Sequence, residues 1–132
     1  MEPVSIALHG VKRIPDVKSK TAVVIGAGMI GLLVIQALKF SGVSRVIAVD
    51  LDEAKLDKAK ELGADEVLLS NEETVTKIHQ LTNGGADVTV EVVGMSATLN
   101  LAIQSTSKGG SISLIGNIEP KTEFPLQAVV TQ

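Results

Sequence analysis

Three closely spaced glycines are the residues of this sequence whose types and spacing best suit the binding of a ligand. They lie in a G-x-G-x-x-G pattern, between a run of small and β-branched residues and a helical pattern: Gly26-Ala27-Gly28-Met29-Ile30-Gly31. In that context Gly26 permits a sharp strand-to-helix turn, Gly28 lets a diphosphate approach the backbone, and Gly31 lets the helix pack closely on a sheet. The N–H groups of Met29 and Ile30 would face the phosphates at the helix N-terminus. The pattern therefore predicts a dinucleotide site.

A carboxylate stands where such a site needs one. Asp50 ends the second predicted strand, 19 residues after Gly31, which is the position of an acid that accepts the hydroxyls of the adenosine ribose. Position 51 is Leu and position 52 is Asp, so no Arg follows to bind a 2′-phosphate, which the carboxylate would repel. NAD is therefore predicted over NADP. Leu51 would cover the adenine, and Lys55 would either reach the same ribose or remain a solvated helix residue.

Two further strands end in small or apolar residues. In an open parallel sheet the ligand lies over the carboxyl ends of the strands, where the strand order reverses. We expect six residues at these ends to make room for the nicotinamide half, although both glycines would also serve simply to end a strand. They are Val92, Val93 and Gly94 after one strand, and Ile115, Gly116 and Asn117 after the other.

Short apolar runs alternate with segments of helical period, the pattern of an α/β fold with a doubly wound parallel sheet, or Rossmann fold. The predicted strands are residues 22–25, 45–49, 66–69, 88–93 and 111–115, and the predicted helices are 29–40, 53–62, one ending at 83–85, and 97–107, with a short extra helix at 3–11. Asp52 is the expected N-cap of the second helix, and Ser70 and Glu73 have capping-box spacing for the third. Gly109-Gly110 would end the fourth.

Residues 1–132 are predicted to form a single NAD-binding domain of a larger enzyme. Five strands with helices on both faces are visible where this fold usually has six, so we expect the sixth strand to be truncated. The strand at 111–115 would then present an open edge that favours homo-oligomers.

Composition argues against several classes of protein. The chain has 12 Lys+Arg against 15 Asp+Glu, a net charge of −3, so it lacks the basic surface that binds a nucleic acid backbone. It contains no Cys, Tyr or Trp, which removes thiol nucleophiles and Tyr acids or bases and favours the cytoplasm. The apolar stretch 22–38 is short for a membrane span and begins with clustered glycines, and no secretory signal is visible. Neither His9 nor His79 has an acid at an orienting spacing, so no catalytic residue is predicted.

The whole chain resembles the coenzyme domain of the medium-chain dehydrogenase/reductase family, in its zinc-containing polyol and alcohol dehydrogenase branch (sorbitol, butanediol or threonine dehydrogenase-like). The matching stretches are E-P-V-S-I-A-L-H-G (2–10), V-I-G-A-G-M-I-G (24–31), V-D-L-D-E-A-K (49–55), L-G-A-D (62–65), G-A-D-V (85–88) and E-V-V-G (91–94). The resemblance implies NAD-dependent, zinc-assisted hydride transfer between a secondary alcohol and a ketone. It also implies that Glu2 contacts the zinc, unless Glu2 is an ordinary N-terminal residue.

The resemblance further implies that zinc is bound only in the full-length enzyme, because the substrate domain that supplies its other ligands is missing. The chain alone is then expected to bind NAD(H) without turnover. A free-standing NAD-sensing regulatory module is the main alternative. A methyltransferase is less favoured because Val24 stands where its additional acid would be, and a short-chain dehydrogenase would need a Tyr.

Overall fold

A computed structural model describes residues 20–115, which form a five-stranded parallel sheet in the order β3-β2-β1-β4-β5. The strands are β1 (Thr21–Ile25), β2 (Arg45–Asp50), β3 (Glu66–Leu69), β4 (Ala86–Glu91) and β5 (Thr106–Leu114). The order reverses beside β1, because the chain builds outward through β2 and β3 and then returns to place β4 on the other side of β1. The predicted doubly wound α/β fold is confirmed.

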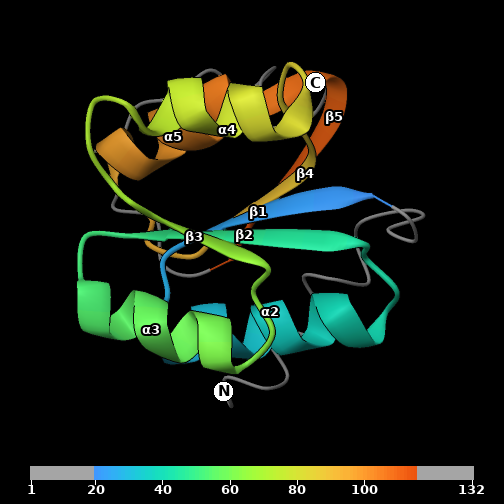
Figure 1. Cartoon of the computed structure of the whole chain (residues 1–132). Coiled ribbons are helices and arrows are strands. Elements are labelled where there is room, and N and C mark those ends of the chain that lie inside the picture. Colours follow the sequence, from blue (N-terminus) through green and yellow to red (C-terminus); the bar gives the residue numbers. More distant parts are fainter. Residues whose placement is uncertain (1–19, 116–132) are drawn as a thin grey trace.

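Two helices cover each face of the sheet (Figure 1). One face carries α2 (Met29–Phe40) and α3 (Glu53–Glu61), and the other carries α4 (Thr74–Thr82) and α5 (Ser96–Ser105). Alternate residues of β1 enter two cores: Val24 packs with the α2 side, whereas Val23 packs with Ile78 of α4 and Ala102 of α5. β1 and β2 are therefore buried on both faces, which explains their continuous apolar runs.

The boundary between α5 and β5 differs from the prediction. The helix gives way to β5 directly at Thr106, so the expectation that Gly109-Gly110 ends the helix is wrong. The hydroxyl groups of Thr106 and Thr89 lie 2.7 Å apart, which ties the start of β5 to β4. Gly110 lies inside β5, where a Cβ would come within 2.9 Å of the Ala86 carbonyl oxygen. This glycine therefore permits the close approach of two strands, beside an irregularity in their register.

The starts of α3 and α4 test the two predicted caps. The Asp52 side chain accepts a hydrogen bond from the Ala54 N–H at 2.9 Å, which confirms the first cap. The second prediction is wrong, because the Ser70 N–H donates to the Asp50 carbonyl at 2.8 Å and Ser70 still belongs to the strand pairing. The N-cap of α4 is Glu73, which makes no side-chain capping bond. In the turn before it, the Asn71 side chain accepts from the Glu73 N–H, and the Asn71 N–H donates to the Thr74 hydroxyl.

β4 ends at Glu91, two residues before the predicted end. The Val92 N–H still donates to the Ile25 carbonyl at 3.1 Å, but the next two N–H groups turn to the Glu91 side chain. The predicted helix at 3–11, a sixth strand, and Glu2, Gly116 and Asn117 lie outside the described residues. Within 20–115, no helix has both the length and the apolar character needed to cross a bilayer.

Candidate functional site

The turn between β1 and α2 is shaped by Gly26 and Gly31. Gly26 has a φ of +105°, in the left-handed region that favours glycine, and a Cβ there would lie 2.7 and 2.8 Å from methyl groups of Val92 and Val93. A Cβ on Gly31 would lie 1.8 Å from the carbonyl oxygen of Gly26. The tightest contact of Gly31 is therefore with the turn itself rather than with the sheet. Both glycines are required by the shape of the loop.

Gly28 serves a different purpose from the other two glycines. It is the N-cap of α2, and a Cβ placed on it would have no atom within 4 Å. The Leu32 N–H bonds back to the Gly28 carbonyl at 2.9 Å, so the N–H groups of Met29 and Ile30 have no partner within the helix. Open space in front of a helix N-terminus with unpaired N–H groups suits a diphosphate.

Asp50 lies against this loop. Its Oδ2 accepts a hydrogen bond from the Ala27 N–H at 2.7 Å, and its Oδ1 accepts one from the Asp52 N–H at 2.9 Å. The strand register explains the placement, since Ile25 pairs with Val49 and Asp50 follows immediately. Each carboxylate oxygen keeps acceptor capacity beyond these bonds. The carboxylate therefore positions the loop and still has lone pairs to offer a ligand hydroxyl.

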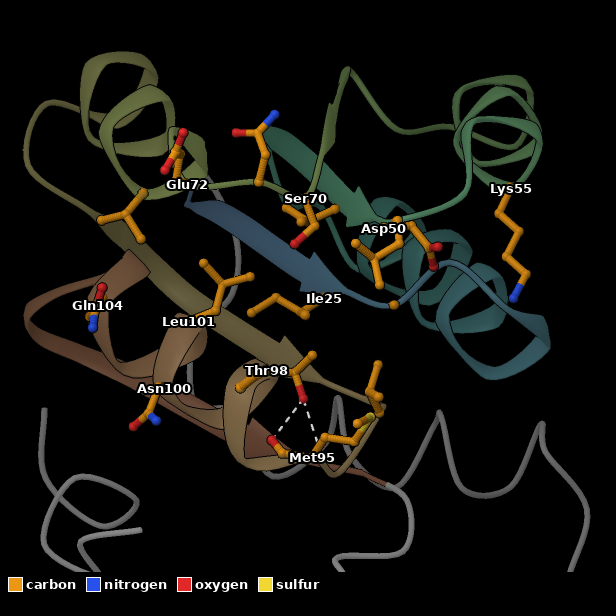
Figure 2. A pocket seen from close by; sticks show the side chains of 17 residues that line it. Ile25, Asp50, Lys55, Ser70, Glu72, Met95, Thr98, Asn100, Leu101 and Gln104 are labelled. Carbon is orange, nitrogen blue, oxygen red and sulfur yellow. Dashed lines mark hydrogen bonds between the residues drawn. The ribbon is translucent and has the colours of Figure 1, made fainter. Parts of the chain in front are cut away.

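A cleft of about 570 Å³ opens over the carboxyl ends of β1 and β2, between the loop and α5 (Figure 2). Five of the predicted residues line it: Gly26, Asp50, Leu51, Lys55 and Val93. Leu51 is 79% exposed and Val93 is 40% exposed, so two apolar side chains border the cleft without being covered by the protein. The volume is within the range of small-molecule sites.

The other predicted residues lie outside this cleft. Gly28, Met29, Ile30 and Gly31 belong to the loop and the first turn of α2, next to Gly26. Val92 packs against the core on the α2 side, Gly94 is buried, and Ile115 is buried in the same core as Val92. The described residues therefore bring together the parts predicted to hold the adenosine and the diphosphate, and they do not bring 92–94 and 115 together in one pocket.

Sequence reasoning missed most of the cleft's far wall. These residues lie between β3 and the first turn of α4, or in the segment after β4 that includes α5: Ser70, Asn71, Val75, Met95, Thr98 and Leu101. Figure 2 shows the Ser70 hydroxyl pointing into the cleft. Residues that follow the carboxyl ends of parallel strands meet at one edge of a sheet, so the position of Ser70 after a predicted strand could have indicated this wall. In the sequence, Ser70 was interpreted only as a helix cap.

The charged residues that line the cleft are two acids and one base: Asp50, Glu72 and Lys55. In Figure 2, Asp50 and Lys55 lie at one end of the cleft, and Gln104 lies at the other. His79 does not line the cleft, and its Nε2 lies 2.7 Å from the Gln104 carbonyl oxygen, a contact that joins α4 to α5. Within residues 20–115, no three His, Asp or Glu side chains gather as a metal site would require.

Comparisons with known proteins show the family and the fold. Residues 29–132 match a protein family described as zinc-binding dehydrogenase. The sequence is 35% identical over 136 residues to the sorbitol dehydrogenase of Bos taurus, covering 100% of this chain and 38% of that protein. The structure matches 2R,3R-butanediol dehydrogenase from Bacillus subtilis with a TM-score of 0.87 and 37% identity, covering 98% of this chain and 38% of that one.

A third similar protein bears on the choice of coenzyme. A Sinorhizobium meliloti 1021 protein whose structure is bound to NADP matches with a TM-score of 0.84 and 26% identity, covering 98% of this chain and 40% of that one. The chain thus spans well under half the length of these relatives.

Proposed function

The chain belongs to the zinc-binding dehydrogenase family, and from that premise we propose that it is the NAD(H)-binding part of an oxidoreductase acting on a secondary alcohol or polyol. The 2.7 Å hydrogen bond from the Ala27 N–H to Asp50 Oδ2 is the observation that carries the proposal. It joins the glycine loop to the predicted ribose acid at one end of the cleft, which is the arrangement a dinucleotide needs.

The diphosphate and the adenosine half of the coenzyme each have a suitable place in this geometry. The diphosphate would lie in the open space at Gly28, against the N–H groups that begin α2. The adenosine ribose would donate its hydroxyls to Asp50, and the adenine would enter the cleft between the exposed side chains of Leu51 and Val93. When bound, the coenzyme supplies the hydride chemistry, and the chain's own residues bind and orient it.

We infer a preference for NAD over NADP from the charges at the cleft. A 2′-phosphate would be placed against the Asp50 carboxylate, with Asp52 two residues further on. Lys55 is the single cation among the described residues that line the cleft. Because a similar protein is bound to NADP, the preference rests on these side chains and not on the family.

The rest of the activity is proposed from the family. Zinc would act as a Lewis acid on the alcohol oxygen in the full-length enzyme, with Glu2 among its contacts. Within residues 20–115, no three His, Asp or Glu side chains lie together as a ligand set, so the residues that hold zinc would lie outside this part of the chain. We further propose a homo-oligomeric, cytoplasmic enzyme whose substrate domain completes the site. This chain alone should bind NAD(H) and form no NADH from an alcohol.

Calorimetric titration of the chain with NADH, NADPH and S-adenosylmethionine in parallel tests the proposal. We expect saturable binding of NADH at one site, NADPH binding at least about tenfold weaker, and no heat from S-adenosylmethionine. Equal affinity for NADH and NADPH would refute the coenzyme preference. A folded chain that does not bind NADH would refute the function.

A further inference from the structure

We propose that Glu91 is a positioning residue for the coenzyme, because its carboxylate holds the turn after β4 against the glycine loop and so sets the affinity of the cleft. The inference rests on the proposed function. Glu91 touches no part of the cleft surface itself, and it acts through the two residues that follow Val92.

Glu91 is a fully buried carboxylate at the end of β4, with 0% exposure. Its Oε2 accepts two backbone hydrogen bonds, from the Val93 N–H at 2.8 Å and from the Gly94 N–H at 2.7 Å. Within residues 20–115, its Oε1 has no hydrogen-bond partner. Burial of a carboxylate with one unpaired oxygen is costly, and an apolar side chain of similar size would avoid that cost. The presence of an acid at this position is therefore explained by the turn that its bonded oxygen holds.

The held turn forms part of both halves of the site. Val93 lines the cleft. Methyl groups of Val92 and Val93 occupy the space where a Cβ of Gly26 would be, so the turn is packed directly on the first glycine of the loop. Gly94 is buried with a φ of +82°, a conformation that L side chains rarely adopt. Displacement of this turn would move one wall of the cleft and release the loop.

The position of Glu91 in the sheet directs its carboxylate towards this task. Glu91 pairs in parallel register with Ile25, which lines the cleft, so the two side chains lie on the same face of the sheet. That face is covered by α5, which begins at Ser96, and the positive end of a helix dipole favours a nearby carboxylate. Without the acid, the N–H groups of Val93 and Gly94 would be left unpaired, and the turn would have to rearrange to satisfy them.

Three variants of the 132-residue chain separate positioning from stability. Glu91→Leu keeps the bulk and removes the acceptor. Glu91→Gln keeps one amide oxygen that can accept both N–H bonds. Thr89→Val is the matched control, because Thr89 is buried on the same face of β4, its hydroxyl contacts Thr106, and neither residue lines the cleft. Each is measured for thermal stability and for its dissociation constant with NADH, at a temperature where it is folded.

We expect Glu91→Leu to weaken NADH binding by about tenfold or more, Glu91→Gln by less than about threefold, and Thr89→Val by less than about twofold even where it lowers the melting temperature. Rescue by glutamine is a result that a purely stabilising role would not give. A folded Glu91→Leu chain that binds NADH as the unaltered chain does would overturn the proposal. So would equal loss of affinity in Glu91→Leu and Thr89→Val.

If Glu91→Leu does not fold, amide hydrogen exchange in the unaltered chain and in Glu91→Gln still tests the proposal. The Val93 and Gly94 amides should exchange slowly in the unaltered chain and in Glu91→Gln. Exchange at the rate of an unstructured peptide would show that the carboxylate does not hold the turn. If these amides are protected but the unaltered chain does not bind NADH, the fault lies with the proposed function and not with the turn.

Discussion

Replacement of Gly28 by alanine should block the dinucleotide and leave the fold nearly unchanged, because the added methyl group would enter space that no protein atom fills. The φ of −78° and ψ of −163° at Gly28 are accessible to alanine. Loss of glycine at a helix N-cap costs about 0.5–1 kcal/mol, and the stiffer unfolded chain offsets about 0.4–1 kcal/mol of this. The free energy of unfolding should therefore change by less than about 1 kcal/mol, which is about 4 °C in melting temperature.

The effect of Gly28→Ala on binding should be much larger. The methyl group would occupy the space proposed for the diphosphate, so we expect the dissociation constant of NADH to rise by about tenfold or more, equivalent to about 1.4 kcal/mol. Fluorescence titration with NADH and a thermal melt of the same sample measure the two effects separately.

Gly31→Ala is the matched control in the same loop. Its methyl group would lie 1.8 Å from the Gly26 carbonyl oxygen, a backbone atom that cannot rotate away. We expect a loss of about 3 kcal/mol or more in unfolding free energy, since overpacking against backbone is at the costly end of its range. If Gly28→Ala instead binds NADH with unaltered affinity, the diphosphate does not approach the backbone at Gly28, and the assignment of the loop is refuted.

Three other perturbations give distinct outcomes. Asp50→Ala should weaken NADH binding by about 1.5–3 kcal/mol and bring the dissociation constants of NADH and NADPH closer together, because both the ribose acceptor and the repelling charge are removed; an unchanged ratio would contradict the preference for NAD. Burial raises the pKa of Asp65, but hydrogen bonds from the Val46 N–H and Lys39 and the charges of Lys39 and Arg45 outweigh it, so the pKa lies below 3.8. The stabilisation that this lowered pKa represents is present above the pKa of the unfolded chain and is lost as the pH falls through the pKa of the folded chain. Asp65→Asn should therefore make urea resistance less dependent on pH below about pH 4. β5 is the outer strand of the described sheet, so sedimentation velocity should show self-association, and a clean monomer at high concentration would count against it.

Local sequence patterns predicted the fold and the meeting of Asp50 with the glycine loop because both follow from short-range rules. The glycine spacing, the apolar runs of β1 and β2, and the N-cap at Asp52 each depend on a few neighbouring residues. The distance of 19 residues from Gly31 to Asp50 worked for a related reason: one helix and one strand of ordinary length bring the carboxylate back to the loop.

The errors fall where a distant contact decides the structure. Helix α5 ends early because Thr106 is tied to Thr89 on the neighbouring strand. Ser70 does not cap α4 because its N–H is already bonded to Asp50 of β2. The partners of Thr106 and Ser70 belong to other elements, so no periodicity could reveal them. Glu91 was missed for a different reason: its two backbone donors, Val93 and Gly94, are only two and three residues away, but in the sequence Glu91 is indistinguishable from an ordinary strand acid.

The residues of the proposed site differ in whether the protein's own contacts also require them, and this decides which variants are informative. Gly26 and Gly31 are fixed by contacts inside the protein, so their substitution changes folding before it changes binding. Asp50 would have both roles, since the oxygen proposed to accept a ribose hydroxyl already accepts the Ala27 N–H, and its removal would loosen the loop as it removes the acceptor. Gly28 has no such internal contact. Loss of affinity at Asp50 is therefore ambiguous by itself, and it becomes evidence for ribose binding only when Gly28→Ala has shown that the intact loop binds the diphosphate.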